Sequence, residues 1–354
     1  MTDRDFSNAK GISQPHFGNS FSLQAEQVVY AGGAINAGIR MAELQKEQSE
    51  SGVEQTRCNQ RFVALGQYLD LYKLANGIKV YDSNIALTHK LIADIKAKQV
   101  QGMALKNDVT RYELQLEQLK LGKRKLQDQK AILNHQLCNT LMLQEVEVVP
   151  EIDLDKAEGR NISESQWQSD AISSSPMLRQ SEIGMQMATQ QLKLAKSELL
   201  PKVAVVAADN FAGPFIYDIP PIDKNFNIWY VGVGVKYSLS SLFKSNKTIR
   251  KAKQQQLLTR NAHALTSETL NNQVQQAYTL HQQAYVELET QQKSVQLAVQ
   301  NYDVVNNRYL NQLALITDMV DASNIRLNAE LQEVNARINV AYTYYNIMYA
   351  AGKL

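Results

Sequence analysis

Side chains that could carry out chemistry are few in this sequence, and most stand far apart. His135 and Cys138 are three positions apart and would share one helix face as two metal ligands, although a packed or solvated pair is the simpler interpretation. Asp318 and Asp321 have the same spacing and would lie on one side of a helix that begins there, where the helix dipole favours acids. The chain has no nucleophile–base arrangement, no glycine-rich phosphate loop and no metal-ligand spacing. The sequence therefore predicts that the protein is not an enzyme and has no metal or cofactor.

The composition excludes several other classes of protein. The 354 residues include 37 Lys and Arg against 35 Asp and Glu, a net charge of +2, whereas a nucleic-acid-binding protein would cluster a basic surplus. We therefore expect no nucleic-acid partner, and the basic run at 120–125 is most simply a solvated helix face. Two cysteines, Cys58 and Cys138, are too few for a disulfide framework.

Apolar runs are short throughout the chain. The longest, 203–208, has six residues, whereas a membrane-spanning helix needs about 18. A transmembrane strand needs only about 10 residues of alternating pattern, so the sequence leaves membrane strands open. The first 20 residues are polar and contain no apolar segment, so no secretory signal is expected in them.

The prolines divide the chain into two long blocks. All seven fall at 15, 150, 176, 201, 214, 220 and 221, which leaves 16–149 and 222–354 free of proline. Because proline breaks helix interiors, each block can hold long helices. An offset of 210 residues aligns them without gaps, with Asn36 matching Asn246 near the start and Ala104-Leu105 matching Ala314-Leu315 near the end. The pattern predicts an internal duplication of one long helical unit.

Each block carries a coiled-coil seam, in which mostly apolar residues recur at steps of four and three. In the second block the seam is Leu270, Val274, Ala277, His281, Ala284, Leu288, Gln291, Val295, Ala298, Tyr302, Val305 and Tyr309. After a break near 312–317, a second helix has one seam through Leu327, Leu331 and Ile338 and a smaller one through Ala322 and Ala336 on its opposite side. Two seams on one helix imply neighbours on both sides, as in the wall of a tube, whereas an ordinary antiparallel coiled coil explains one seam better than two.

Short alternating segments come before the long helices. Trp229, Val231 and Val233 alternate with Tyr230, Gly232 and Gly234 ahead of the second block, a similar segment at 21–29 comes before the first, and a third follows Pro201. Period-two alternation predicts strands. One apolar face with aromatic residues towards the ends is typical of outer-membrane strands, although half-buried strands of soluble proteins show the same alternation.

Together these features resemble the TolC-like outer-membrane efflux proteins. The resemblance runs from about 19 to 352, and its motifs are as follows: Val29-Tyr30-Ala31-Gly32-Gly33, Ser175-Pro176-Met177-Leu178-Arg179, Gln101-Gly102-Met103-Ala104-Leu105 with Asp108, and Tyr309 through Leu313-Ala314-Leu315 with Asp318. It implies a mainly α fold with a small β part, in which two repeated long α-hairpins form part of an α-helical barrel and strands contribute to a transmembrane β-barrel. Relative to the family pattern, a signal sequence, a first helical pair and a first strand are missing, so three strands stand where four are usual.

The resemblance also divides the chain into five parts. These are a remnant or disordered N-terminus at 1–18, repeat 1 at 19–138, an equatorial region at 139–175, a short helix with a strand and external loop at 176–227, and repeat 2 at 228–352. The equatorial region holds Trp167 and an acidic run: Glu145, Glu147, Glu151, Asp153 and Asp155.

The resemblance implies a homotrimer, and threefold symmetry gives the tip residues a function. Asp318 and Asp321 would become stacked carboxylate rings, a constriction that favours cations, and Tyr309 would pack the closed tip. The first repeat has Arg111 in place of the second acid, so its tip should be less acidic. The expected contacts with a periplasmic adaptor are at both tips: Gly102, Met103, Ala104, Leu105, Asp108, Leu313, Ala314 and Leu315.

We therefore expect a passive exit duct of a tripartite efflux or type I secretion system, in the outer membrane and periplasm of a Gram-negative bacterium. Its partners would be outer-membrane lipid, a periplasmic adaptor and an inner-membrane transporter. The alternative is a periplasmic coiled-coil adaptor or a structural protein. An adaptor would show glycine-rich lipoyl-like repeats around a single hairpin, whereas this chain has two hairpins preceded by strands.

Overall fold

The computed structural model describes residues 17–144, 147–151, 162–214 and 224–354, and within them the chain is mainly helical with one small sheet. The predicted acids Glu145, Asp153 and Asp155, and most of the predicted N-terminal part, lie outside the described residues. The strands are β1 (Asn19–Tyr30), β2 (Lys202–Gly213) and β3 (Phe226–Lys236), and the helices are α1 (Ala34–Val100), α2 (Lys106–Thr140), α3 (Glu164–Ser174), α4 (Pro176–Ser197), α5 (Ser241–Leu310) and α6 (Ile316–Ala350). The predicted fold class is confirmed: two long helical hairpins, each preceded by a strand.

The chain divides into two compact units, and α1, α4 and α5 each contribute to both. The first unit, 1–48 with 181–262, holds the three strands, and the second, 49–180 with 263–354, holds the hairpins. None of the helices in the described part of the chain combines the length and apolarity that a membrane crossing requires.

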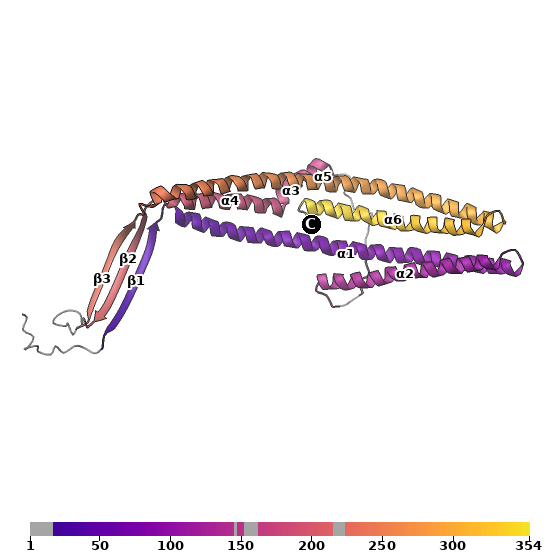
Figure 1. Cartoon of the computed structure of the whole chain (residues 1–354), viewed down its shortest axis with the longest axis horizontal. Helices are drawn as coiled ribbons and strands as arrows, with labels where there is room; N and C mark the ends of the chain where they lie inside the picture. The colour runs from indigo at the N-terminus through magenta and orange to yellow at the C-terminus, as the bar shows by residue number, and fades with distance from the viewer. Residues whose placement is uncertain (1–16, 145–146, 152–161, 215–223) are drawn as a thin grey trace, which may run out of the picture. The chain divides into compact units, whose positions relative to one another are not determined.

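In the first unit the strands form an antiparallel sheet in the order β1-β2-β3 (Figure 1). The register confirms the predicted alternation, because Val203 pairs with Val235 and Val205 with Val233, which places these side chains on one face. Trp229, on the same face, is 71% exposed. The sheet therefore has one largely apolar face that no other part of the described chain covers.

The turn from β1 into α1 explains the paired glycines of the first motif. Gly32 and Gly33 both have positive φ angles, +61° and +86°. A Cβ atom on Gly32 would lie 2.8 Å from the Ser197 carbonyl oxygen and 2.8 Å from the Leu200 Cβ. Only glycine therefore fits where β1 turns into α1 beside the end of α4.

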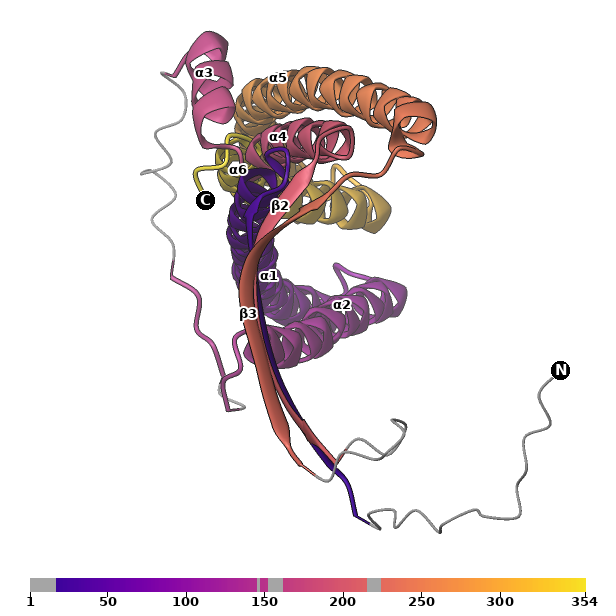
Figure 2. The same cartoon turned by 90° about the vertical axis from the view of Figure 1, so that its left-hand side faces the viewer.

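In the second unit α1 and α2 form one hairpin, and α5 and α6 form the other (Figure 1). Figure 2 shows the same helices in a view turned by 90°. The α5 seam is buried as predicted, at Leu270, Val274, Ala277, His281, Ala284, Ala298 and Tyr302. Helix α6 is buried on both predicted sides, since Leu327 and Ile338 are buried on one and Ala322 and Ala336 on the other. Two-sided packing of α6 is thus a property of the single chain.

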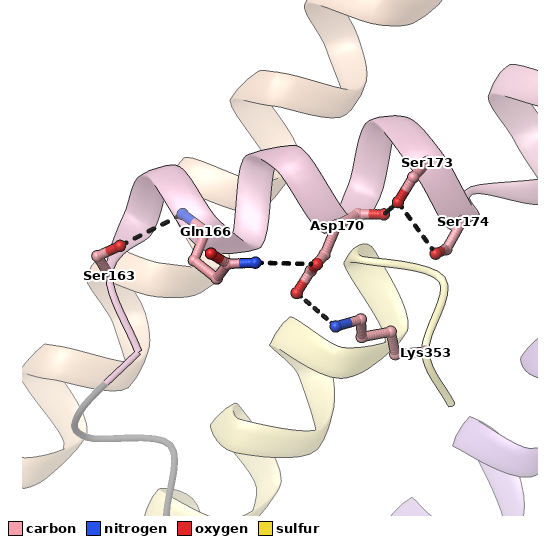
Figure 3. Close-up of polar contacts among 6 residues, drawn as sticks. All are labelled: Ser163, Gln166, Asp170, Ser173, Ser174 and Lys353. Carbon is pink, nitrogen blue, oxygen red and sulfur yellow. Dashed lines mark hydrogen bonds and ion pairs between the residues drawn. The ribbon is translucent and has the colours of Figure 1, made fainter.

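Helix α3 packs against the middle of α5 and the C-terminal end of α6. Its Trp167 and Ala171 are buried against Leu270 and Val274 of α5 and Ile347 of α6. Asp170 of α3 forms an ion pair with Lys353, just beyond α6, and also accepts a hydrogen bond from Gln166 (3.2 Å; Figure 3). The paired ammonium group lowers the pKa of the Asp170 carboxyl group below its usual value.

Candidate functional site: the two hairpin tips

The two hairpin tips have the same backbone geometry at an offset of 210 residues. In the first, the Met103 amide donates to the Lys98 carbonyl (2.9 Å), and in the second the Leu313 amide donates to the Arg308 carbonyl (2.8 Å). The residue before each donor has a positive φ angle, +75° at Gly102 and +62° at Gln312. This left-handed residue ends the incoming helix at both tips, although only the first has the favoured glycine. The duplication predicted from the sequence therefore reappears in the backbone.

Asp108 and Asp318 perform the same local task at the two tips. An Oδ2 atom of Asp108 accepts a hydrogen bond from the Leu105 amide (3.1 Å), and Asp318 does the same for the Leu315 amide (3.0 Å). Each carboxylate also lies in the first turn of its helix, where the dipole favours negative charge. Both acids therefore stabilise a helix start, which is one of the two functions that the sequence allowed for Asp318.

Asp321 has no such local task. It lies one turn beyond Asp318 on α6 and is exposed, and none of the described residues makes a hydrogen bond or ion pair with it. Arg111, at the matching place on α2, is exposed as well. The acidic character that distinguishes the second tip from the first is thus concentrated in the exposed Asp321 carboxylate.

Tyr309 lies between the two tips. Its half-buried ring packs against the buried tip cluster, and Lys98 at the end of α1 lies 5.9 Å from its centre. The Lys98 ammonium group also donates to the Leu310 carbonyl (2.8 Å), so one side chain connects the first hairpin to the second. Burial raises the pKa of Tyr309 to about 12, and the negative charge of Asp108 adds to the shift.

A core drawn from four helices supports both tips. It contains Leu91, Ile92 and Ile95 of α1, Val109, Tyr112 and Leu116 of α2, Tyr302 of α5, and Ile316, Met319 and Ala322 of α6. Tyr112 is fully buried, and its hydroxyl group has no hydrogen-bond partner within the described residues. Burial raises the pKa of Tyr112 well above its usual value. The two hairpins therefore meet in a shared apolar core beneath their tips.

The tips leave apolar side chains in solvent. Leu105 and Leu315, equivalent under the 210-residue offset, are both 70% exposed, and Leu313 and Met103 are exposed beside them. Ala104 packs against the tip core, whereas Ala314 is half-buried and Gly102 is exposed. The predicted contact residues are therefore gathered at the two turns, and matching leucines stand at matching places.

The two hairpins are also joined by hydrogen bonds between polar side chains, and the sequence did not indicate these residues. The Gln115 amide donates to the Asn324 Oδ1 atom (2.6 Å) between α2 and α6, and the Asn84 amide donates to Glu330 (2.7 Å) between α1 and α6. These partners are more than 200 positions apart, so no local spacing indicates them. Within the described part of the chain, no group of three or more His, Cys, Asp and Glu side chains is placed to hold a metal ion.

Comparison with known proteins gives one family. A profile of the outer membrane efflux protein family matches residues 167–353, more than half of the chain. The match covers α3, α4, β2, β3 and the whole second hairpin. No curated protein matches the chain in sequence.

Solved structures give the same architecture over nearly the whole chain. The outer membrane protein VceC from Vibrio cholerae is 13% identical with a TM-score of 0.78, and the match covers 99% of this chain and 84% of VceC. CusC is 11% identical with a TM-score of 0.85, covering 98% of this chain and 80% of CusC. The Campylobacter jejuni CmeC outer membrane channel is 13% identical with a TM-score of 0.73, covering 95% and 78%. At these identities the likeness establishes the fold, including the hairpin that the family profile does not reach.

Proposed function

Because the chain belongs to the outer membrane efflux protein family, we propose that three copies of it assemble into a passive exit duct that crosses the outer membrane and continues into the periplasm. The protein is accordingly a transport channel component and not an enzyme. The observation that carries the proposal is that two surfaces of the single chain, on the sheet and on the long helices, are apolar and uncovered.

The sheet supports placement in a lipid bilayer. Its apolar face exposes Val231, Val233 and Val235 of β3 and Leu23 of β1, with Trp229 beside them. The opposite face of β3 carries the small Gly232 and Gly234 in the half of the strand next to α5, and larger side chains towards its start. Lipid on one side and a water-filled interior on the other would match this asymmetry. The unpaired edges of β1 and β3 would then be covered by the neighbouring copies, since open sheet edges are not stable in lipid.

The long helices support assembly with other copies. Helix α5 buries one seam inside the chain, yet its other sides expose Leu265, Val286, Leu297 and Val304. Helix α2 likewise exposes Leu114, Leu121 and Ile132. Isolated exposed leucines are common, but their recurrence along several helices is typical of surfaces that pack against another subunit.

The tips would form the constriction and the partner-binding end of the duct. In a threefold assembly Asp321 would occur three times around the axis, and its exposed carboxylate would attract cations to the opening. Asp318 would line the same opening while holding the start of α6. The exposed Leu105 and Leu315, with the adjoining tip residues, would contact a periplasmic adaptor that connects the duct to an inner-membrane transporter. Membership of the family favours this function over the alternative of a coiled-coil adaptor or structural protein.

Conductance through planar lipid bilayers tests the proposal. The full chain, extracted in detergent and inserted, should give discrete channels that Mg²⁺ blocks from the side bearing the tips. Asp321→Asn should weaken this block at least tenfold, because three charges leave the opening at once. Asp108→Asn is the matched control: it removes an acid from the first tip and should leave the block nearly unchanged. Absence of any conductance would refute the duct, and unchanged Mg²⁺ block in Asp321→Asn would refute the ring.

A further inference from the structure

A pocket of about 380 Å³ lies where the sheet meets the start of α5, wholly inside the first unit. Three stretches line it: the link from α4 into β2, the end of β3 with the turn that follows, and the first two turns of α5. The lining includes three lysines, four serines and a threonine, with Glu198 as its one acid among the described residues. A cavity of this size suits a small molecule, and its lining is basic and rich in hydroxyl donors.

Two of the lysines face each other across the sheet. Lys202 of β2 and Lys236 of β3 are direct partners in the antiparallel register, so their side chains leave the same face with Cβ atoms about 5 Å apart. Like charges in this arrangement repel, and within the described residues neither lysine forms an ion pair. An anion between them would relieve the repulsion.

The third lysine stands at a helix start that lacks an acid. Lys244 lies in the first turn of α5, a 70-residue helix with no acidic residue in that turn. The positive end of the helix dipole favours negative charge there, so a lysine is the less favourable choice when the pocket is empty. An anion in the pocket would interact favourably with both the dipole and the ammonium group.

Ser245 adds a hydroxyl group to the pocket wall. Ser245 is only 2% exposed and lines the pocket, and it makes no hydrogen bond with any of the described residues. Its neighbour Ser241, by contrast, donates to the Ser238 carbonyl (2.6 Å). A hydroxyl group on a pocket wall that makes no hydrogen bond with the described residues is available to donate to a ligand.

We propose that this pocket binds a phosphate group. Phosphate oxygens accept hydrogen bonds from ammonium and hydroxyl donors alike, and the lysines and Ser245 provide both. The pocket is larger than phosphate alone, which leaves room for the rest of a phosphorylated molecule. Lys236 follows Val235 in β3 and so lies on the sheet face opposite to the exposed valines, which faces water if the apolar face meets lipid. The ligand is either a soluble phosphomonoester or a phospholipid headgroup, and neither requires that the chain conducts.

The test is binding of inorganic phosphate to the full chain in neutral detergent, measured by isothermal titration calorimetry at low ionic strength. A parallel arm counts phosphatidylglycerol molecules retained from mixed micelles by native mass spectrometry. Binding in the first arm assigns a soluble ligand, and binding in the second alone assigns a lipid headgroup. Both outcomes support a phosphate site, whereas binding in neither arm overturns it.

Three variants locate the binding. The double change Lys202→Gln/Lys236→Gln should weaken binding at least tenfold, because two charge-assisted contacts are lost. Ser245→Ala should weaken it about threefold while leaving the melting temperature of the ligand-free protein unchanged, since the hydroxyl group makes no hydrogen bond with the described residues. Lys247→Gln removes an exposed lysine that does not line the pocket, and binding should persist. Equal losses in the Lys247→Gln control and the double variant would show general charge attraction and overturn the site.

Discussion

Replacing Tyr112 with phenylalanine tests the packing beneath the tips most sharply. The ring is fully buried in the core shared by α1, α2, α5 and α6, yet its hydroxyl group has no hydrogen-bond partner within the described residues. Ser323 interacts with the Tyr112 hydroxyl group, and its own hydroxyl group donates to the Met319 carbonyl (2.8 Å). Tyr112→Phe therefore removes a desolvated polar group and keeps the apolar ring.

The magnitude follows from two opposing effects. A buried hydroxyl group without a partner costs about 1–3 kcal/mol, and its removal leaves a gap of one oxygen atom whose lost contacts offset part of the gain. We expect Tyr112→Phe to change the free energy of unfolding by between zero and about 1 kcal/mol in the stabilising direction. Tyr112→Ala deletes the whole ring and should cost about 3–5 kcal/mol, as large-to-small changes in packed cores do.

Urea unfolding followed by circular dichroism measures both changes in the free energy of unfolding, provided that its slope against urea concentration is the same in each variant. The reasoning is wrong if Tyr112→Phe destabilises the chain by more than about 1.5 kcal/mol, the range expected for loss of a hydrogen bond. In that case Ser323→Ala should show strong coupling to Tyr112→Phe in a double-mutant cycle.

Three further predictions concern other parts of the chain. Gly33→Ala should lower the free energy of unfolding by about 1 kcal/mol, because Gly33 has a positive φ angle. Gly32→Ala should lower it by about 1–3 kcal/mol more, because the added Cβ also meets the Ser197 carbonyl oxygen. Equal losses in urea unfolding would contradict this close approach. His281 is fully buried and burial lowers its pKa, so protons bind the unfolded chain more readily and stability should fall as the pH drops below about 6.5. His281→Leu should reduce the difference in melting temperature between pH 7.5 and 5.5, and an unchanged difference would count against this assignment. Tyr309 has a pKa of about 12 in the folded chain against 10 in the unfolded chain, so it should contribute stability below pH 10 that is lost as the pH rises towards 12. Tyr309→Phe should reduce this loss of stability at alkaline pH. An identical dependence of stability on pH in the variant would contradict the prediction.

Long-range periodicity made much of the fold predictable. The seam of α5 and the double seam of α6 follow from spacing alone, because an extended helix repeats the same burial many times and the pattern tolerates a few exceptions. In α2 the buried apolar residues Val109, Tyr112, Leu116 and Leu119 are followed by Lys123 and Lys130, which interrupt the pattern. Each of these lysines has an acid partner, Asp82 at 2.6 Å and Glu147 at 2.9 Å.

The candidate site was less predictable, because one residue type serves two purposes. An acid at the start of a helix is expected both for capping and for a charged opening, and spacing does not separate Asp318, which caps, from Asp321, which has no partner among the described residues. The pocket beside β3 is a different case. It depends on the strand register that places Lys202 opposite Lys236, and a residue pattern within either strand does not indicate that register.

The mass of the detergent-extracted full chain tests the central claim most directly. Native mass spectrometry should give three times the chain mass of 39.8 kDa, because the uncovered faces of the sheet and of the long helices require neighbouring copies. A stable, detergent-independent monomer of 39.8 kDa would contradict the proposed duct.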